Sequence, residues 1–219
     1  MNKVISLEAA IDYVKDGMTL MIGGFGGRGT PENIIDALVL RNIKNLTIIT
    51  NDTGFVDKGV GKLVVNKQVK KVMASHVGTN PETGRQMNSG ELEVELIPQG
   101  TLVERIRCGG AGIGGFLTQT GIGTKIQEGK EIIRVNDISY LLELPLRADI
   151  AIIRASIADK QGNVYYNGAT RNFNPVMATA ADIVIVGAHE VVEIGELDPN
   201  YVMTPGILVD FVVGGEPIG

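Results

Sequence analysis

The sequence predicts a single α/β domain over residues 1–219, built on a mostly parallel sheet with helices on both faces and one antiparallel hairpin. Three observations lead to this prediction. Short apolar runs at 20–22, 150–153 and 183–186 have the continuous hydrophobicity of strands that are buried on both faces. Segments with helical spacing of apolar residues alternate with strand patterns, as in folds that cover a parallel sheet on both sides. The 219 residues contain no linker, repeat or low-complexity tract, and this length suits one domain.

The first half of the chain alternates between helical and strand patterns. Residues 7–15 have their apolar side chains on one helical face, and the strand at 20–22 leads into a glycine-rich loop. Residues 91–97 alternate apolar and acidic side chains, which is typical of a strand with one wet face near a sheet edge. Between them the patterns predict, in order, a helix from Pro31 to about Leu40, a strand from Leu46 to Ile49, a helix from Gly59 to Asn66 and a strand from Val69 to Ala74.

The second half begins with a predicted helix from Thr101 to Cys108, which Gly109 and Gly110 are expected to end. A second glycine-rich loop is predicted over residues 109–124. The remaining patterns predict strands from Glu131 to Val135 and from Ile138 to Leu144, joined by Asn136-Asp137 as a tight hairpin, then strands at 150–153, 163–166 and 183–186 and a brief helix at 175–180.

Composition and charge exclude several kinds of partner. The formal net charge is −5, there is no Trp, and no basic stripe is present, so nucleic-acid binding is not expected. No apolar run approaches the ~18 residues that a membrane span needs. Glu8 and Asp12 interrupt the N-terminal stretch where a signal-peptide core would lie. A cytoplasmic protein that binds no membrane is therefore expected.

Metal and thiol chemistry are not indicated by the sequence. The nitrogen and sulfur ligands that the chain offers, His76, His189 and Cys108, are far apart and have no zinc spacing. Cys108 is the single cysteine, so no internal disulfide is expected, and we interpret it as a packed residue. Each His is interpreted as a hydrogen-bonded structural residue, and no permanently bound cofactor is expected.

The stretch around the first glycine cluster differs from the rest of the chain because a buried strand opens into a loop with almost no side chains. Thr30 offers a helix N-cap, Pro31 suits the first helical position, and Glu32 complements the positive helix end. Bare backbone lets a ligand come close, and a helix start presents free N–H groups to an anion. The loop residues predicted to bind a ligand are Gly23, Gly24, Phe25, Gly26, Gly27, Arg28 and Gly29.

Two other interpretations of this loop remain open. Gly24, Gly26 and Gly29 fit the dinucleotide pattern G-x-G-x-x-G, and Asp52 ends the next predicted strand, near where a ribose-binding acid would lie. However, Thr30 would begin the helix after the third glycine, whereas a dinucleotide fold has that glycine within the helix. The loop is alternatively a tight crossover that binds no ligand.

Three segments of the chain follow predicted strands and carry polar or glycine residues: the glycine loop, Asn51-Asp52 and Gln99-Gly100-Thr101. Because ligands of open α/β sheets bind beyond the carboxyl ends of the strands, we expect these segments to share one cleft. Gln99 and Asn51 can donate to a carboxylate or thioester oxygen without adding charge, with cap and turn roles as the alternatives. Arg28 is either an anion ligand or a solvated loop residue.

Several motifs in order resemble the first, or alpha, chain of the family I CoA-transferases. They are Asp16-Gly17 with Gly23-Gly24-Phe25 and Gly29-Thr30-Pro31, then Asn51-Asp52-Thr53, residues 75–81 (Ser-His-Val-Gly-Thr-Asn-Pro), residues 98–105 (Pro-Gln-Gly-Thr-Leu-Val-Glu-Arg) and residues 171–175 (Arg-Asn-Phe-Asn-Pro). The resemblance covers nearly the whole chain. Within the family it is greatest to the alpha chain of the acetate/butyrate–acetoacetate CoA-transferases.

The resemblance implies transfer of coenzyme A, as a substrate, between acetoacetyl-CoA and short-chain acids such as acetate and butyrate. It implies a glutamyl-CoA thioester on a glutamate of the second subunit, in a Ser-Glu-Asn-Gly type motif that this sequence lacks, and it places Gln99 at the substrate pocket. The expected protein is thus a non-nucleophilic alpha subunit, which joins a beta subunit in an assembly with two copies of each chain. An NAD-binding oxidoreductase domain and a non-catalytic sugar-phosphate sensor are the alternatives.

Overall fold

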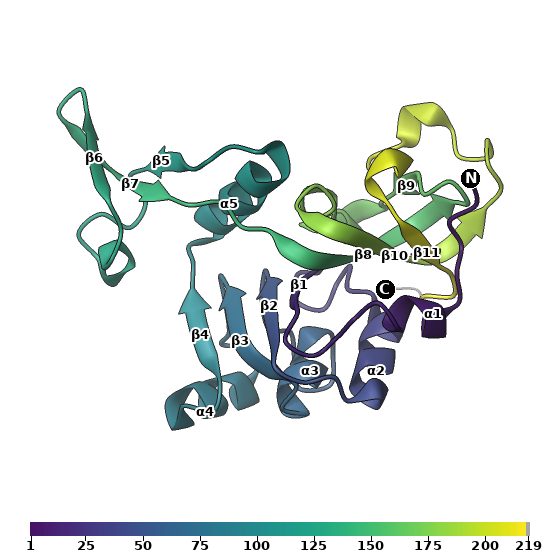
Figure 1. Cartoon of the computed structure of the whole chain (residues 1–219), viewed down its shortest axis with the longest axis horizontal. Helices are drawn as coiled ribbons and strands as arrows, with labels where there is room; N and C mark the ends of the chain where they lie inside the picture. Colours follow the sequence, from purple (N-terminus) through teal and green to yellow (C-terminus); the bar gives the residue numbers. More distant parts are fainter. Residues whose placement is uncertain (218–219) are drawn as a thin grey trace.

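The computed structural model describes residues 1–217, in which a long, mostly parallel sheet forms the centre (Figure 1). The strands lie in the order β11-β10-β8-β1-β2-β3-β4, all parallel, and β9 pairs antiparallel with β8 outside this path. Their bounds are β1 (Thr19–Ile22), β2 (Leu46–Thr50), β3 (Val69–Ala74), β4 (Glu93–Leu96), β8 (Ala148–Asp159), β9 (Val164–Tyr165), β10 (Ala181–Val192) and β11 (Phe211–Val213). The predicted edge position of the fourth strand is confirmed, since β4 ends the sheet.

Helices cover both faces of this sheet, as predicted. They are α1 (Leu7–Ile11), α2 (Glu32–Arg41), α3 (Val60–Val65), α4 (Pro81–Ser89), α5 (Gln99–Ala111) and α6 (Asn174–Met177), with 3-10 turns η1 (Lys125–Gln127), η2 (Gly168–Thr170), η3 (Pro199–Tyr201) and η4 (Gly206–Leu208). Successive side chains of β1 enter two different cores. Leu20 and Ile22 pack with the buried residues of α2 and α3, whereas Met21 packs with those of α5 and α6. A fully apolar strand is therefore required at this position.

A small antiparallel sheet extends from the body as an arm (Figure 1, left). It contains β5 (Phe116–Thr118), β6 (Ile132–Val135) and β7 (Ile138–Glu143), in the order β5-β7-β6. Asn136 and Asp137 have φ angles of 49° and 63°, the left-handed pair that a two-residue hairpin turn requires. The predicted hairpin is confirmed, and β5 adds a third strand within the segment predicted to be loop.

Several predicted element boundaries were wrong. Helix α1 ends at Ile11, not at residue 15, and α5 runs through both glycines that were expected to end it. Those glycines lie within the helix because the chain packs tightly against them: a Cβ at Gly109 would lie 1.9 Å from the Leu146 carbonyl oxygen, and one at Gly110 would lie 2.0 Å from Thr179 Oγ1. Both positions need glycine because neighbouring parts of the chain come too close for a side chain, and not because the helix ends there.

Helix α4 and strand β11 were not predicted. The α4 sequence lacks a clear apolar period, yet its start has ordinary signals: Asn80 Oδ1 accepts a hydrogen bond from Glu82 N at 3.1 Å, and Pro81 is the first helical residue. The alternating pattern over residues 91–97 predicted that its apolar side chains share one buried face. Leu92 is buried, but Leu96 is 48% exposed. Among residues 1–217, no helix has the length and apolar character needed to cross a membrane.

Candidate functional site

The carboxyl ends of four neighbouring strands, β1 to β4, bring the predicted site segments together. A series of hydrogen bonds runs along this edge, from the glycine loop after β1 to the start of α5. Gly26 N donates to Asp52 Oδ2 at 2.8 Å, Ser75 N donates to Asn51 O at 3.0 Å, and Ser75 Oγ donates to Gln99 Oε1. The expected proximity of the three segments is confirmed, while their sharing of one cleft stays a prediction. Ser75, which lies outside the three segments, links two of them.

Asp52 anchors the glycine loop to the end of β2. Its carboxylate is 9% exposed and accepts three N–H groups, from Gly26 N, Gly54 N and Asn51 Nδ2, each at 2.8 Å. A carboxylate that is buried and occupied in this way has little capacity left for a ribose hydroxyl. The NAD interpretation therefore loses the acidic residue on which it depended.

The base of the glycine loop is packed against the chain itself. A Cβ at Gly23 would lie 1.7 Å from Asn174 Oδ1, and one at Gly24 would lie 2.0 Å from Thr30 Oγ1. Asn172 Oδ1 accepts from Gly24 N at 3.1 Å, and Asn174 Nδ2 donates to Gly29 O at 3.0 Å. The 171–175 motif thus holds the loop base, a tertiary role that its sequence did not reveal.

The tip of the loop, Phe25 to Arg28, is exposed. Phe25 and Arg28 exchange backbone hydrogen bonds of 2.9 and 3.0 Å, and Phe25 is 56% exposed. Gly26 has a φ of +56° and no atom within 4 Å of the position of a Cβ, so its backbone is accessible. Of the seven predicted loop residues, four form this tip, whereas Gly23, Gly24 and Gly29 lie at the base against the chain's own atoms.

A polar pocket of about 690 Å³ lies beside this tip. It is lined by Gly26, Gly27, Arg28, Glu32, Asp57, Lys58, Lys62, Arg154 and Pro217. Lys62 pairs with Glu32 at 2.6 Å, and Arg154 Nη1 donates to the Thr30 carbonyl oxygen at 3.2 Å. Within residues 1–217, Arg28 and Lys58 have no carboxylate within ion-pair distance, so the pocket carries two cations that remain available to an anion.

The start of α2 differs from the prediction. Its N-cap is Pro31 rather than Thr30, and no side chain at that position caps the helix. The cap comes instead from the other end of the chain: the Glu216 carboxylate, 2% exposed, accepts from Asn33 N at 3.2 Å and from Ile34 N at 3.4 Å. These are the N–H groups that were expected to face an anion, and the protein's own carboxylate occupies them.

Replacement of Glu216 is expected to weaken the fold. Glu216→Ala should lower the free energy of unfolding by about 1 kcal/mol, the usual cost of losing a helix cap. Glu216→Gln retains an acceptor and should lose less. Urea unfolding of both variants measures this, with exposed Glu128→Ala as the control. An equal loss for Glu128→Ala and Glu216→Ala would show that the cap is not the cause.

The pH dependence of that stability should also change. Burial raises the pKa of Glu216 above 4.5, against the opposing effect of the N–H groups that it accepts. A raised pKa means that the carboxyl favours folding fully below its ordinary pKa, and that this contribution is lost as the pH rises through the raised value. The stability of Glu216→Gln relative to wild type should therefore increase as the pH rises from 4.5 through the raised pKa of Glu216.

Gln99 and Asn51 have different surroundings. Gln99 is the exposed first residue of α5, and the helix N-cap is Pro98, so the Gln99 amide does not cap its helix. Asn51 is 1% exposed and its amide donates to Asp52. Substrate contact by either residue stays a prediction, and the accessible amide at this edge is that of Gln99.

The histidines and the cysteine lie outside the hydrogen-bonded series. His76 is exposed beside the Asp52 backbone, and His189 Nδ1 is 2.7 Å from the Glu216 carbonyl oxygen. Cys108 is fully buried on α5. The interpretation of Cys108 as a packed residue is confirmed. In the described part of the chain, no three His, Cys, Asp or Glu residues gather into a metal-binding group.

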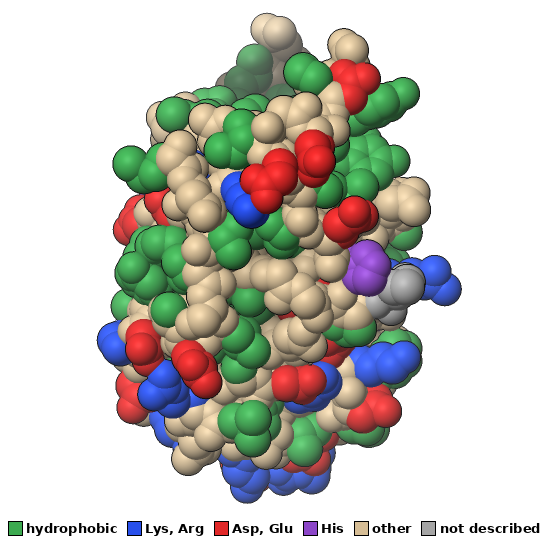
Figure 2. All heavy atoms as spheres, turned by 90° about the vertical axis from the view of Figure 1, so that its right-hand side faces the viewer, with side chains coloured by type: hydrophobic (Ala, Val, Ile, Leu, Met, Phe, Trp, Pro, Cys, Tyr) green, Lys and Arg blue, Asp and Glu red, His purple; other side chains and the backbone are tan. Residues whose placement is uncertain are grey.

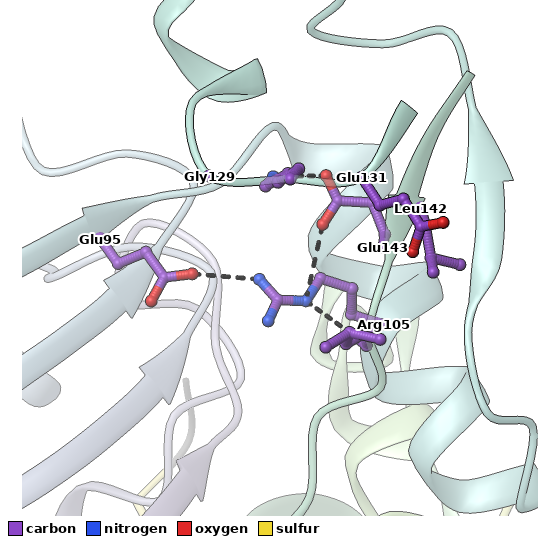
Figure 3. A pocket seen from close by; sticks show the side chains of 8 residues that line it. Glu95, Arg105, Gly129, Glu131, Leu142 and Glu143 are labelled. Atoms are coloured by element: carbon purple, nitrogen blue, oxygen red, sulfur yellow. Dashed lines mark hydrogen bonds and ion pairs between the residues drawn. The ribbon is translucent and has the colours of Figure 1, made fainter. Parts of the chain in front are cut away.

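A second pocket, of about 350 Å³, lies between β4, α5 and the arm (Figure 3). Arg105 points into it and donates to Glu95 at 3.1 Å and to the Leu144 carbonyl oxygen at 2.8 Å, while its Nε lies 3.9 Å from Glu143. Glu143, 1% exposed, also pairs with Lys130. Arg105 thus links β4 of the body to the arm, through Glu95 on one side and Glu143 and the Leu144 carbonyl oxygen on the other. On the face shown in Figure 2, acidic, basic and hydrophobic side chains are interspersed.

Comparison with known proteins gives consistent results. The sequence profile of the coenzyme A transferases matches residues 4–215. The alpha subunit of acetate CoA-transferase from Escherichia coli K12 is 54% identical over 97% of this chain and 96% of its own length. The acetoacetyl-CoA:acetate/butyrate CoA transferase alpha subunit of Clostridium acetobutylicum is 56% identical over 97% of each chain.

Solved structures have the same fold. An acyl-CoA transferase from Escherichia coli O157:H7, crystallised as a thioester complex with CoA, has a TM-score of 0.85 and 26% identity over 100% of this chain. The present chain spans about half the length of that protein, 50%. Glutaconate coenzyme A-transferase from Acidaminococcus fermentans has a TM-score of 0.85 at 21% identity, over 96% of this chain and 75% of its own length.

Proposed function

Because the chain belongs to the coenzyme A transferase family, we propose that it is the alpha subunit of an enzyme that moves CoA between acetoacetyl-CoA and acetate or butyrate. The observation that carries this proposal is the identity of 54–56% over 97% of the chain to alpha subunits named for these acids. The NAD-binding and sugar-phosphate-sensor alternatives have no support among these relatives. Coenzyme A enters as a substrate, and a cytoplasmic location stays a prediction.

The proposed reaction uses a carboxylate of the beta subunit to carry CoA. This glutamate carboxylate attacks the acyl-CoA carbonyl carbon, the C–S bond breaks, and a mixed anhydride and a CoA thiolate form. The thiolate then attacks the glutamyl carbonyl of the anhydride, which releases the acyl group as a carboxylate and leaves a glutamyl-CoA thioester. A second carboxylate takes CoA by the same steps in reverse. Each addition places negative charge on a carbonyl oxygen, and we propose that the Gln99 amide donates a hydrogen bond to that oxygen.

Three carboxylates near the site, Asp52, Glu32 and Glu95, are engaged by the chain's own donors, which supports a nucleophile from outside this chain. Asp52 accepts three N–H groups. Glu32 accepts from Gly59 N at 3.0 Å and pairs with Lys62, and Glu95 pairs with Arg105 and Lys71. A carboxylate held by several donors is a weak nucleophile, since its charge is already stabilised.

The beta subunit would bring its glutamate to the edge formed by the carboxyl ends of β1 to β4. Phe25 and Phe55, 56% and 40% exposed, lie on two adjacent turns at this edge, and exposed apolar groups of this kind are frequent in subunit interfaces. We infer an assembly of two copies of each chain, the closed arrangement that a two-fold axis gives.

The loop tip provides a test of ligand contact. Gly26→Ala should raise the Michaelis constant for acyl-CoA several-fold in the assembled enzyme, because a side chain intrudes where the ligand approaches. Gly112→Ala is the matched control: Gly112 also has a positive φ, +68° against +56°, and open space around its Cβ position, but it ends α5 away from the loop. Equal kinetics for the two variants would show that the loop tip is structural only.

A further inference from the structure

Ser75 lies between Asn51 and Gln99, and its hydroxyl group can give its proton to only one of them. Its Oγ is 2.8 Å from the Asn51 carbonyl oxygen and also contacts Gln99 Oε1. The Asn51 carbonyl oxygen already accepts the backbone N–H of Ser75, at 3.0 Å. A serine hydroxyl carries a single proton, and because the Gln99 amide oxygen faces Ser75 Oγ in the structure, that proton lies between these two oxygens.

In the structure, this contact leaves one end of the Gln99 amide free. A glutamine amide has an acceptor end, the oxygen, and a donor end, the NH₂ group. Ser75 engages the acceptor end, and within residues 1–217 no protein group accepts a hydrogen bond from Gln99 Nε2. The donor end of an exposed side chain is therefore left facing outward at the edge of the sheet.

Ser75 itself is held firmly in place. It directly follows β3, whose last residue, Ala74, is fully buried, and its backbone N–H is fixed to Asn51, which is 1% exposed. Gln99, by contrast, is an exposed side chain whose amide has Ser75 as its hydrogen-bond partner. Ser75, whose backbone is held by β3 and Asn51, is thus the residue that holds the exposed Gln99 amide, in the orientation with Oε1 toward the hydroxyl.

We propose that Ser75 is a positioning residue, which holds the Gln99 amide with Nε2 directed toward the reacting thioester. In the opposite orientation the amide oxygen would face the oxygen that gains negative charge, and the two would repel each other. The proposal rests on the proposed role of Gln99 as a donor in CoA transfer. Ser75 does not touch the substrate in this account and acts through Gln99.

The test is a double-mutant cycle on the enzyme assembled with its beta subunit. Ser75→Ala should lower kcat roughly three- to tenfold, the population change that one ordinary hydrogen bond controls, with little change in KM. Ser75→Thr retains the hydroxyl and should restore most of kcat. In a Gln99→Ala background, Ser75→Ala should have no further effect, because the amide that it orients is gone.

Two controls separate this effect from a loss of structure. Ser139→Ala removes an exposed hydroxyl from the arm, and it should leave kcat unchanged. Circular dichroism and assembly with the beta subunit should be the same for all variants. A Ser75→Ala effect of equal size with and without Gln99 would overturn the proposal while leaving the role of Gln99 intact, and so would an unchanged kcat in Ser75→Ala. Near-wild-type turnover of Gln99→Ala would overturn both.

Discussion

Purified without a beta subunit, this chain is expected to transfer no CoA from acetoacetyl-CoA to acetate or butyrate. The reaction needs a covalent carrier for CoA. Three carboxylates near the candidate site, Asp52, Glu32 and Glu95, are each engaged by the chain's own donors, and the fourth, Asp57, is an aspartate, whereas the family resemblance implies a glutamate. Groups that only position a substrate cannot replace the missing nucleophile. Addition of the beta subunit should restore activity, which the disappearance of acetoacetyl-CoA measures.

The control for this experiment is a stoichiometric titration. Activity should rise in proportion to the added beta chain and saturate at one beta chain per alpha chain, because each site needs both. Size-exclusion chromatography should show a larger assembly over the same range. Full activity of the isolated alpha chain would contradict the proposed division of labour.

Gln99→Ala in the assembled enzyme is expected to lower kcat by roughly 10²–10³-fold, the usual loss on removal of one donor to a developing oxyanion. The amide is exposed and does not cap α5, so the loss should occur without a change in circular dichroism. Exposed Gln119→Ala, on the arm segment, is the matched control and should turn over normally. Near-wild-type turnover of Gln99→Ala would remove Gln99 from the reaction.

The sequence was sufficient to predict the parts of the fold that local patterns encode. The apolar strands, the Asn136-Asp137 hairpin and the edge position of β4 all follow from periodicity and turn chemistry over a few residues. The convergence of the glycine loop, Asn51 and Gln99 followed from a general rule about the ends of parallel strands.

What the sequence could not reveal depends on contacts between distant residues. The cap of α2 joins Asn33 to Glu216, 183 positions away, and the base of the loop is held by Asn172 and Asn174. The glycines inside α5 were interpreted as a helix end because their close neighbours, Leu146 and Thr179, lie far along the chain. Similar polar residues occur in many loops, and only the folded chain distinguishes those that touch the site.

The location of the covalent intermediate tests the central claim most directly. The assembled enzyme should be incubated with acetoacetyl-CoA, treated with borohydride to reduce the enzyme thioester, digested, and examined by mass spectrometry. The reduced side chain should appear on one glutamate of the beta subunit, with none on residues 1–217 of this chain. A reduced glutamate in this chain would contradict its assignment as the non-nucleophilic subunit.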